Sequence, residues 1–169
     1  MKNKPVKINL GCGGYKLDGF INVDIDIKAE PDVVADVRNL LSVGKAEVIY
    51  AGHLLEHFDY NVGLQLLKRW REWLIEGGEI YIVVPDIDIF VKNYLEGTFV
   101  FGQLQQGCFG YGIGVDAMEK DRHKAMFNYD VLKKMLQDAG YKDVHKFDYN
   151  VCPYVLSKAA EQLCVKATK

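Results

Sequence analysis

The sequence lacks the cysteine spacing of metal-binding or redox proteins and an excess of positive charge. Its four cysteines, at positions 12, 108, 152 and 164, lie far apart and form no CxxC pair, so neither a zinc knuckle nor a redox motif is indicated. Lysine and arginine number 21 against 23 acidic residues, which gives a formal charge of −2. This balance argues against a protein held on nucleic acid by bulk charge.

Long apolar runs are missing as well. The longest are far too short to span a bilayer, and residues 1–7, with three lysines, do not resemble a signal peptide. Scattered cysteines fit a reducing compartment. We therefore expect a cytoplasmic protein without a membrane or nucleic-acid partner, whose oligomeric state is open. The 169 residues predict one domain, large enough to bury roughly 70% of its unfolded surface.

Short apolar runs predict a β-sheet. Each is nearly continuous rather than alternating, which favours parallel strands covered on both faces. The runs cover residues 6–10, 21–25, 32–37, 47–51 and 79–84, and two last strands, at 143–149 and 162–167, could form a hairpin across 151–161.

Two segments show helical spacing of apolar residues. The first begins at Asp59 or Asn61, either of which can cap it, and is expected to end at Gly77-Gly78. The second is capped by Asn128 and ends at Gly140. Between them, residues 87–127 hold many glycines and aromatic residues with no clear period, which predicts a long loop that serves as a lid or acceptor-binding insert.

A glycine turn and an acid give the first indication of function. Gly11-Cys12-Gly13-Gly14 directly follows the first strand, and Asp24 closes the second. Glycine lets the backbone approach a ligand closely, and an acid at this place can accept both hydroxyls of a ribose. The connection from Gly13 to Asp24 is too short for a full crossover helix. The pattern predicts a nucleoside-cofactor site that is open on one side.

These motifs, in this order, resemble the class I S-adenosylmethionine (SAM) dependent methyltransferases. The resemblance rests on residues 9–14, 23–26, 35–37, 50–58 and 76–81, and it covers nearly the whole chain. It implies an α/β fold, a Rossmann-like three-layer sandwich with a mostly parallel seven-stranded sheet whose last strand is antiparallel. It also implies SAM as the cofactor and methyl transfer as the activity.

Two departures from the family pattern concern the glycine motif. Position 9 is Asn where the family usually has an acid, and the third spaced glycine is absent. The chain is similar to a compact branch of the family that lacks the first helix. This similarity is carried by Phe101, Gly102 and Gln103 and by residues 121–124. We associate members of that branch with surface-carbohydrate gene neighbourhoods. The expected acceptor is therefore a small molecule or a sugar-containing compound.

The resemblance assigns the nucleoside end of SAM to two strand ends. Asp24 would accept the ribose hydroxyls, and Asp36 would accept from the adenine amino group. Ile25 and Val37 would surround the adenine ring with apolar side chains. Either acid alone would be read as a solvated strand end, but their joint placement behind a glycine turn favours the site.

The resemblance also implies that the backbone of the glycine turn contacts the methionine end of SAM. Gly11, Cys12 and Gly13 would contact it, and Gly52 and His53 would lie opposite them at the end of the fourth strand. Methyl transfer is an in-line displacement, so the protein mainly has to align the acceptor behind the methyl group.

A hydroxyl or amine acceptor also has to lose a proton. Candidate bases are His123, His53, His57 and Asp86, and histidine has the most suitable ordinary pKa, about 6.5. His123 lies in the insert, and Asp86 follows the fifth strand, at the edge where open α/β sheets bind ligands. We predict His123 and Asp86 as catalytic residues.

Three other readings are open. His53, Glu56 and His57 spell H-x-x-E-H, which on one helix, with a third ligand such as Glu119, would make a zinc metallohydrolase. The glycine turn and Asp24 also suit a nicotinamide cofactor, although the missing helix counts against pyrophosphate binding. The third alternative is a non-catalytic module that binds SAM or interacts with another protein. We favour the methyltransferase without a bound metal.

Overall fold

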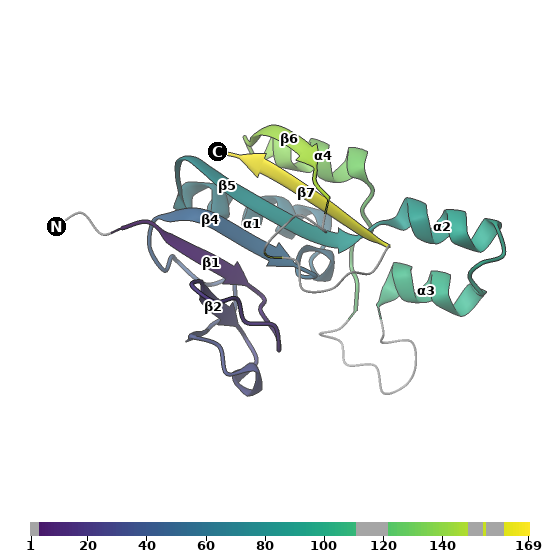
Figure 1. Ribbon diagram of the computed structural model, residues 1–169, viewed down its shortest axis with the longest axis horizontal. Coiled ribbons are helices and arrows are strands. Elements are labelled where there is room, and N and C mark those ends of the chain that lie inside the picture. The colour runs from purple at the N-terminus through teal and green to yellow at the C-terminus, as the bar shows by residue number, and fades with distance from the viewer. Residues whose placement is uncertain (1–3, 111–121, 149–153, 155–160) are drawn as a thin grey trace.

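A seven-stranded sheet with strand order β3-β2-β1-β4-β5-β7-β6 forms the centre of the protein (Figure 1). The structure is a computed structural model that describes residues 4–110, 122–148, 154 and 161–169. The strands are β1 (Val6–Leu10), β2 (Ile21–Asp24), β3 (Val33–Val34), β4 (Ala46–Gly52), β5 (Leu74–Pro85), β6 (Lys142–Lys146) and β7 (Gln162–Thr168).

The pairing of the strands confirms the predicted fold class. β1 pairs in parallel with β2 and β4, and β4 pairs in parallel with β5. The last strand, β7, lies antiparallel between β5 and β6. The carboxyl ends of β1, β2, β4 and β5 therefore meet at one edge of the sheet, where α/β folds bind ligands.

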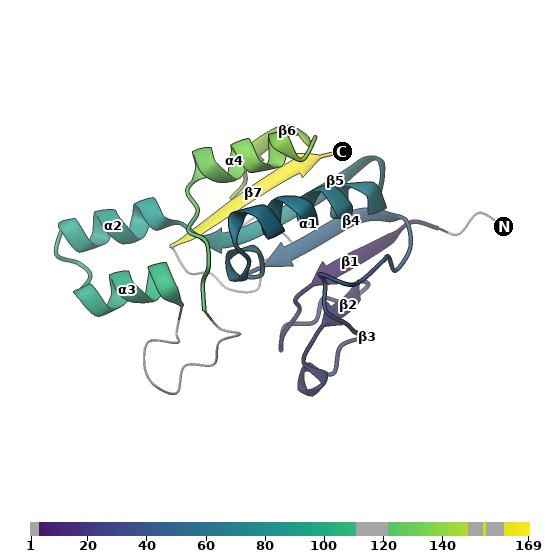
Figure 2. The same ribbon diagram turned by 180° about the vertical axis from the view of Figure 1, so that it is seen from behind.

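Helices α1 (Tyr60–Trp73) and α4 (Tyr129–Asp138) cover one face of the sheet (Figure 2). Asp59 caps α1 by accepting from the Val62 N–H, and Asn128 caps α4, as predicted. Trp70 is fully buried within the core beneath these helices. The apolar side of the first long helix is therefore part of the core and not of a ligand site.

The opposite face of the sheet carries a second apolar cluster. Its buried members are Leu17, Phe20, Val48, Tyr50, Val83 and Cys164, with Tyr81, Phe147 and Tyr154 packed against them. Leu17 and Phe20 belong to the connection between β1 and β2, and no helix forms in residues 11–20. The short Gly13-to-Asp24 spacing correctly predicted this absence.

Several predicted boundaries were wrong. The third strand is only Val33–Val34, because Asp32 pairs with Asn22 and Asp36 begins a turn. α1 ends at Trp73 rather than at Gly77-Gly78, because Leu74 is already extended and pairs with Ala46 of β4. The two glycines lie inside β5, where its pairing with β4 shifts register.

Residues 87–127 are not the loop that was predicted. They contain α2 (Ile87–Leu95) and α3 (Phe101–Phe109), which pack against each other beyond the carboxyl ends of the strands (Figure 1). Gly107 permits this contact, because a Cβ there would lie 2.4 Å from the Phe90 ring. Residues 111–121 of the insert are outside the described part of the chain. Whether the insert acts as a lid stays a prediction.

Two short 3-10 helices complete the fold. η1 (Ile27–Ala29) follows β2, and η2 (Leu55–His57) follows β4. Among the described residues, no helix has both the length and the apolar character needed to cross a bilayer.

Candidate cofactor and acceptor site

A cavity of about 650 Å³ opens at the carboxyl ends of β1, β4 and β5. This volume lies in the range of small-molecule sites. One side is lined by Asn9, Gly11, Cys12, Gly13, Gly14 and Tyr15, the middle by Tyr50, Gly52, His53, Val83, Pro85, Glu161 and Gln162, and the other side by Phe90, Phe99, Gln103, Gln106, Gly107 and His123. The cavity thus joins the glycine turn to the α2–α3 insert.

The glycine turn has a backbone that only glycine adopts easily. Gly11 has φ of 65°, and an added Cβ would lie 2.7 Å from a methyl carbon of Leu54. Gly13 has φ of 49°, and its N–H donates to Oδ2 of Asp24 at 2.7 Å. The predicted turn and the predicted acid are therefore in direct contact, and the acid fixes the turn.

Asp24 keeps the capacity to bind a ligand. Its Oδ2 accepts from Gly13 and its Oδ1 accepts from the Asp26 N–H at 2.8 Å. An ionised carboxylate has about four lone-pair sites, so further acceptor positions remain for hydroxyl groups. Asp24 itself borders the turn rather than lining the cavity.

A buried amide network replaces the helix that is absent after β1. Asn9 and Asn22 are 2% and 5% exposed, and the Asn9 side chain donates to Oδ1 of Asn22 at 2.9 Å. Asn22 also accepts from the Leu17 N–H and donates to Asp32. The hydrogen bonds from Asn22 lower the pKa of Asp32, so this carboxylate stays charged. From the sequence, Asn9 is only a departure from the family pattern, and this network was not predicted.

Cys12 is a buried residue that lines the cavity. Burial, followed by the nearby Asp24 charge, raises the pKa of its thiol to about 11. A neutral thiol is a poor nucleophile, so the Cys12 side chain is a small packing group rather than a reactive one.

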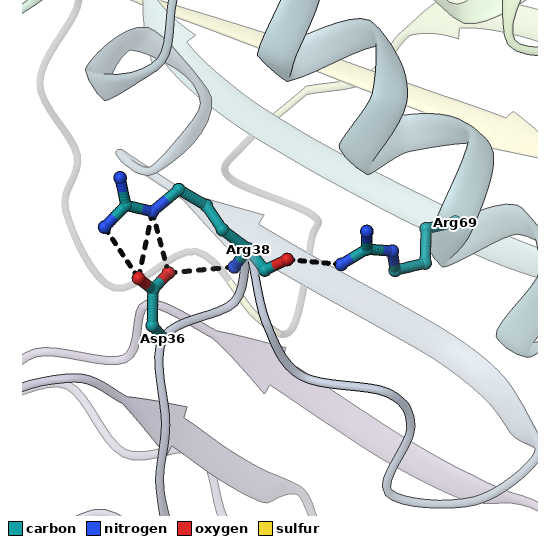
Figure 3. Close-up of polar contacts among 3 residues, drawn as sticks. All are labelled: Asp36, Arg38 and Arg69. Carbon is teal, nitrogen blue, oxygen red and sulfur yellow. Dashed lines mark hydrogen bonds and ion pairs between the residues drawn. The ribbon is translucent and has the colours of Figure 1, made fainter.

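The predicted adenine-side residues lie outside the cavity lining. The Asp36 carboxylate is held by Arg38, whose Nη2 lies 2.6 Å from Oδ2, and the Arg38 carbonyl accepts from Arg69 (Figure 3). Arg38 also lowers the pKa of Asp36. Ile25 is exposed and Val37 is buried. Their roles toward adenine stay predictions.

Gly52 ends β4 and His53 follows it, and both line the same cavity as the glycine turn. A Cβ on Gly52 would lie 2.5 Å from the Tyr50 hydroxyl oxygen, so a larger residue would displace Tyr50. His53 has φ of 52°, and its Nδ1 lies 3.2 Å from Oε1 of Glu56. Its Nε2 lies 3.0 Å from the side-chain nitrogen of Gln162.

His123 lies on the insert side of the cavity, as predicted. It is half-buried, and its Nδ1 is 3.3 Å from the carbonyl oxygen of Gly107. Burial lowers the pKa of His123, partly offset by the charge of Glu56. The ring also meets that of His57 edge to face, with centroids 5.3 Å apart.

Asp86, the second predicted catalytic residue, does not line the cavity. Its Oδ1 accepts from the Asp88 N–H at the start of α2, and its Oδ2 lies 3.9 Å from the Lys146 ammonium. Burial raises the pKa of this carboxyl. In the structure Asp86 caps a helix.

The geometry required for the zinc-hydrolase reading is absent. His53 follows β4 with a left-handed backbone, whereas Glu56 and His57 belong to η2, so the motif does not lie within one helix. Glu119 is outside the described residues. That reading was wrong in its structural context.

Side chains from the insert line the side of the cavity away from the glycine turn, and they were not predicted individually. Phe90 and Phe99 pack edge to face with centroids 5.7 Å apart, and Gln103 and Gln106 add polar groups. The aromatic content of the insert was visible in the sequence. Which of these residues face the cavity follows from two helices that the pattern did not reveal.

The fold is that of the class I SAM-dependent methyltransferases. No family model matches the sequence, and no curated protein does either. Solved structures do match. A SAM-dependent methyltransferase from Archaeoglobus fulgidus aligns at a TM-score of 0.62 with 18% identity, covering 99% of this chain and 87% of that one.

Two further matches are with structures that contain the cofactor or its product. Human N-acetylserotonin methyltransferase in complex with SAM aligns at a TM-score of 0.63 with 15% identity, covering 98% of this chain. The plantazolicin methyltransferase BpumL in complex with SAH aligns at 0.62 with 15% identity, covering 99% of this chain and 77% of that one. The chain spans only 47% of the human protein. At these identities the likeness establishes the fold.

Proposed function

We propose that the protein transfers a methyl group from SAM to a small-molecule acceptor. The observation that carries this is the contact between the glycine turn and the acid of β2, Gly13 N–H to Asp24 at 2.7 Å, beside a cavity of about 650 Å³. In this fold the same edge of the sheet binds nucleoside cofactors. The neighbours solved with SAM or SAH support this choice of cofactor.

The residues present fit SAM. Asp24 has acceptor positions for the ribose hydroxyls, and the open backbone of Gly13, with no atom within 4 Å of an added Cβ, leaves room for the methionine portion. When bound, SAM supplies an electrophilic methyl group. Ile25, Asp36 and Val37 are proposed for the adenine, with Arg38 holding Asp36 in place.

The acceptor is proposed to bind between the end of β4 and the insert. Phe90 and Phe99 offer aromatic surface, and Gln103 and Gln106 offer hydrogen bonds. Aromatic rings with polar neighbours suit a flat ring or the apolar face of a sugar. A sugar-containing acceptor remains our proposal within the class of small molecules.

Two residues, His123 and Asp86, are proposed as the base that removes a proton from the acceptor. His123 has the better position, because it lines the cavity and Asp86 does not. Asp86 is buried and uses Oδ1 to cap α2, which leaves Oδ2, 3.9 Å from the Lys146 ammonium, as its free oxygen.

The test is calorimetric titration of the purified protein with SAH. We expect one site per chain, and we expect Asp24→Ala to weaken binding at least about tenfold, because a hydrogen bond to a charged group contributes roughly 1.5–3 kcal/mol. Asp138→Ala is the matched control, since Asp138 is an acid on α4 that pairs with Lys134. Unchanged affinity in a folded Asp24→Ala variant would overturn the cofactor assignment.

A further inference from the structure

Three metal-ligating side chains come together beside the cavity, and one of them, His123, lines it. Glu56, His57 and His123 each place one ligand atom within 4.8 Å of those of the other two. Glu56 and His57 belong to η2, whereas His123 comes from the segment before α4. This set shares two residues with the H-x-x-E-H motif but replaces His53 with a histidine far away in the sequence.

Backbone hydrogen bonds hold the two segments in register. The carbonyl oxygen of Glu56 accepts from the Lys124 N–H at 2.7 Å and from the Ala125 N–H at 3.2 Å. The N–H of His123 donates to the carbonyl of Phe109 at the end of α3. These backbone hydrogen bonds bring the segments that carry His57 and His123 close together, so the proximity of the two side chains does not depend on their rotamers alone.

Both histidine rings are oriented in the way that metal ligands are. Nδ1 of His57 lies 3.2 Å from the carbonyl oxygen of Arg122, and Nδ1 of His123 lies 3.3 Å from that of Gly107. A carbonyl can only accept, so these contacts require Nδ1–H as donor and leave the lone pair on Nε2 when the ring is neutral. Such outer hydrogen bonds fix the tautomer of metal-binding histidines.

Glu56 is a buried acid with an unused oxygen. The residue is 1% exposed, its Oε1 lies 3.2 Å from Nδ1 of His53, and its Oε2 is buried with no hydrogen-bond partner. Among the residues that the structure describes, no lysine or arginine pairs with it. Buried carboxylate oxygens are normally satisfied, because leaving one without a partner is costly. This oxygen points to a ligand that the side chains do not supply.

We propose that Glu56, His57 and His123 bind a divalent transition-metal cation beside the cavity. Two imidazoles and one carboxylate suit zinc, iron and similar ions, with coordination positions left open. In a tetrahedral zinc site, bonds of about 2.1 Å put the ligand atoms roughly 3.4 Å apart, so the side chains close in on binding.

The cation would have a role in acceptor binding, and this part rests on the proposed function. His123 lines the cavity, so an open position on the cation is reachable by a hydroxyl or amine of the acceptor. A bound cation would lower the pKa of a coordinated hydroxyl, so that its proton passes to water without a side-chain base and its oxygen takes the methyl group as SAH leaves. His123 would then be a ligand and not the base.

The test is metal binding by the full chain after chelator treatment and dialysis. Zn²⁺ is titrated by calorimetry, and Co²⁺ is titrated with its visible absorption as a second measurement. We expect one Zn²⁺ per chain and a Co²⁺ spectrum distinct from that of the aquo ion. His57→Ala and His123→Ala are each expected to lower the affinity for Zn²⁺ at least about tenfold.

The fourth histidine of the chain provides the matched control. His145 lies on β6, where its Nδ1 contacts the carbonyl of Asp143, and His145→Ala should leave the affinity for Zn²⁺ unchanged. His53→Ala should weaken binding less than His123→Ala, because His53 only supports Glu56. The reverse order would favour the set His53, Glu56 and His57 and overturn the proposed set.

Titration of the chelator-treated protein with SAH separates the two proposals. Binding of SAH without Zn²⁺ binding would overturn the metal site and leave the cofactor assignment intact. Binding of Zn²⁺ without SAH would remove the proposed function and leave the metal site. Absence of a Co²⁺ spectrum in the unmutated protein overturns the metal site even if a variant fails to fold.

Discussion

The two walls of the cavity are built in different ways. The glycine-turn wall is backbone and small side chains, held from behind by the buried amides of Asn9 and Asn22 and by the Gly13–Asp24 contact. The insert wall is made of residues on α2 and α3 together with Phe99 and His123 beside them, and Gly107 is the only buried residue of the two helices. One wall is fixed by hydrogen bonds to the sheet, and the other by helix-to-helix contact beyond it.

Under the proposed function, the first wall serves the cofactor and the second wall serves the acceptor. A cofactor shared by many enzymes calls for a fixed site, and the first wall supplies it through strand ends. The second wall touches the sheet little, so its residues can vary without loss of the core. We therefore expect substitutions on the first wall to cost stability or cofactor affinity, and those on the second to act locally.

Asn22→Ala should give the largest loss of stability. It removes a buried side chain that bonds Asn9, Leu17 and Asp32 and leaves their polar groups without partners. We expect the free energy of unfolding to fall by about 2–4 kcal/mol in urea denaturation. Gln106→Ala, on the insert wall, should change it by less than about 0.5 kcal/mol. Equal losses would remove the distinction between the walls.

Gly107→Ala should have an intermediate effect confined to the insert. The new Cβ would lie 2.4 Å from the Phe90 ring, and overpacking of this kind costs roughly 1–3 kcal/mol. Affinity for SAH should not change, because the glycine turn is on the other wall.

A second glycine in the same helix provides the control for that substitution. Gly102 has no atom within 4 Å of an added Cβ, so Gly102→Ala should be neutral or slightly stabilising by thermal unfolding. If Gly107→Ala is as mild as Gly102→Ala, the close contact of α2 with α3 is wrong.

Arg38→Ala should give the smallest effect, and one that depends on pH. The pair with Asp36 lies near the surface and contributes about 0.5–1 kcal/mol. Because Arg38 lowers the pKa of Asp36 in the folded state, the pair stabilises the protein above the ordinary pKa of an aspartate. That contribution is lost as pH falls through the lowered pKa.

Stability measured against pH checks this prediction. The difference in free energy of unfolding between the unmutated protein and Arg38→Ala should be present at neutral pH and should shrink in acid. A difference that is constant across this range would mean that packing of the Arg38 side chain, and not its charge, accounts for the effect.

Much of the sheet could be predicted from the sequence, because most strands contain a short apolar run, although β6, with the sequence KDVHK, does not. The same logic located α1 and α4, whose caps Asp59 and Asn128 have the predicted role. The glycine turn and Asp24 were predicted as parts of one site, and the structure brings them into contact. These features depend on local patterns that a single sequence displays.

The insert and the polar network could not be predicted in the same way. α3 contains Gly102 and Gly107, and glycine inside a helix weakens the helical pattern, although Gly107 is needed for packing on Phe90. The bond between Asn9 and Asn22 joins two strands, so spacing along the chain does not reveal it. The grouping of His123 with Glu56 likewise follows from backbone pairing between distant segments.

The most direct measurement is calorimetric titration of the unmutated protein with SAH, with NAD⁺ titrated in parallel. The account predicts one SAH site per chain at concentrations below millimolar and no comparable binding of NAD⁺. Failure to bind SAH at millimolar concentration, or tighter binding of NAD⁺, would contradict it.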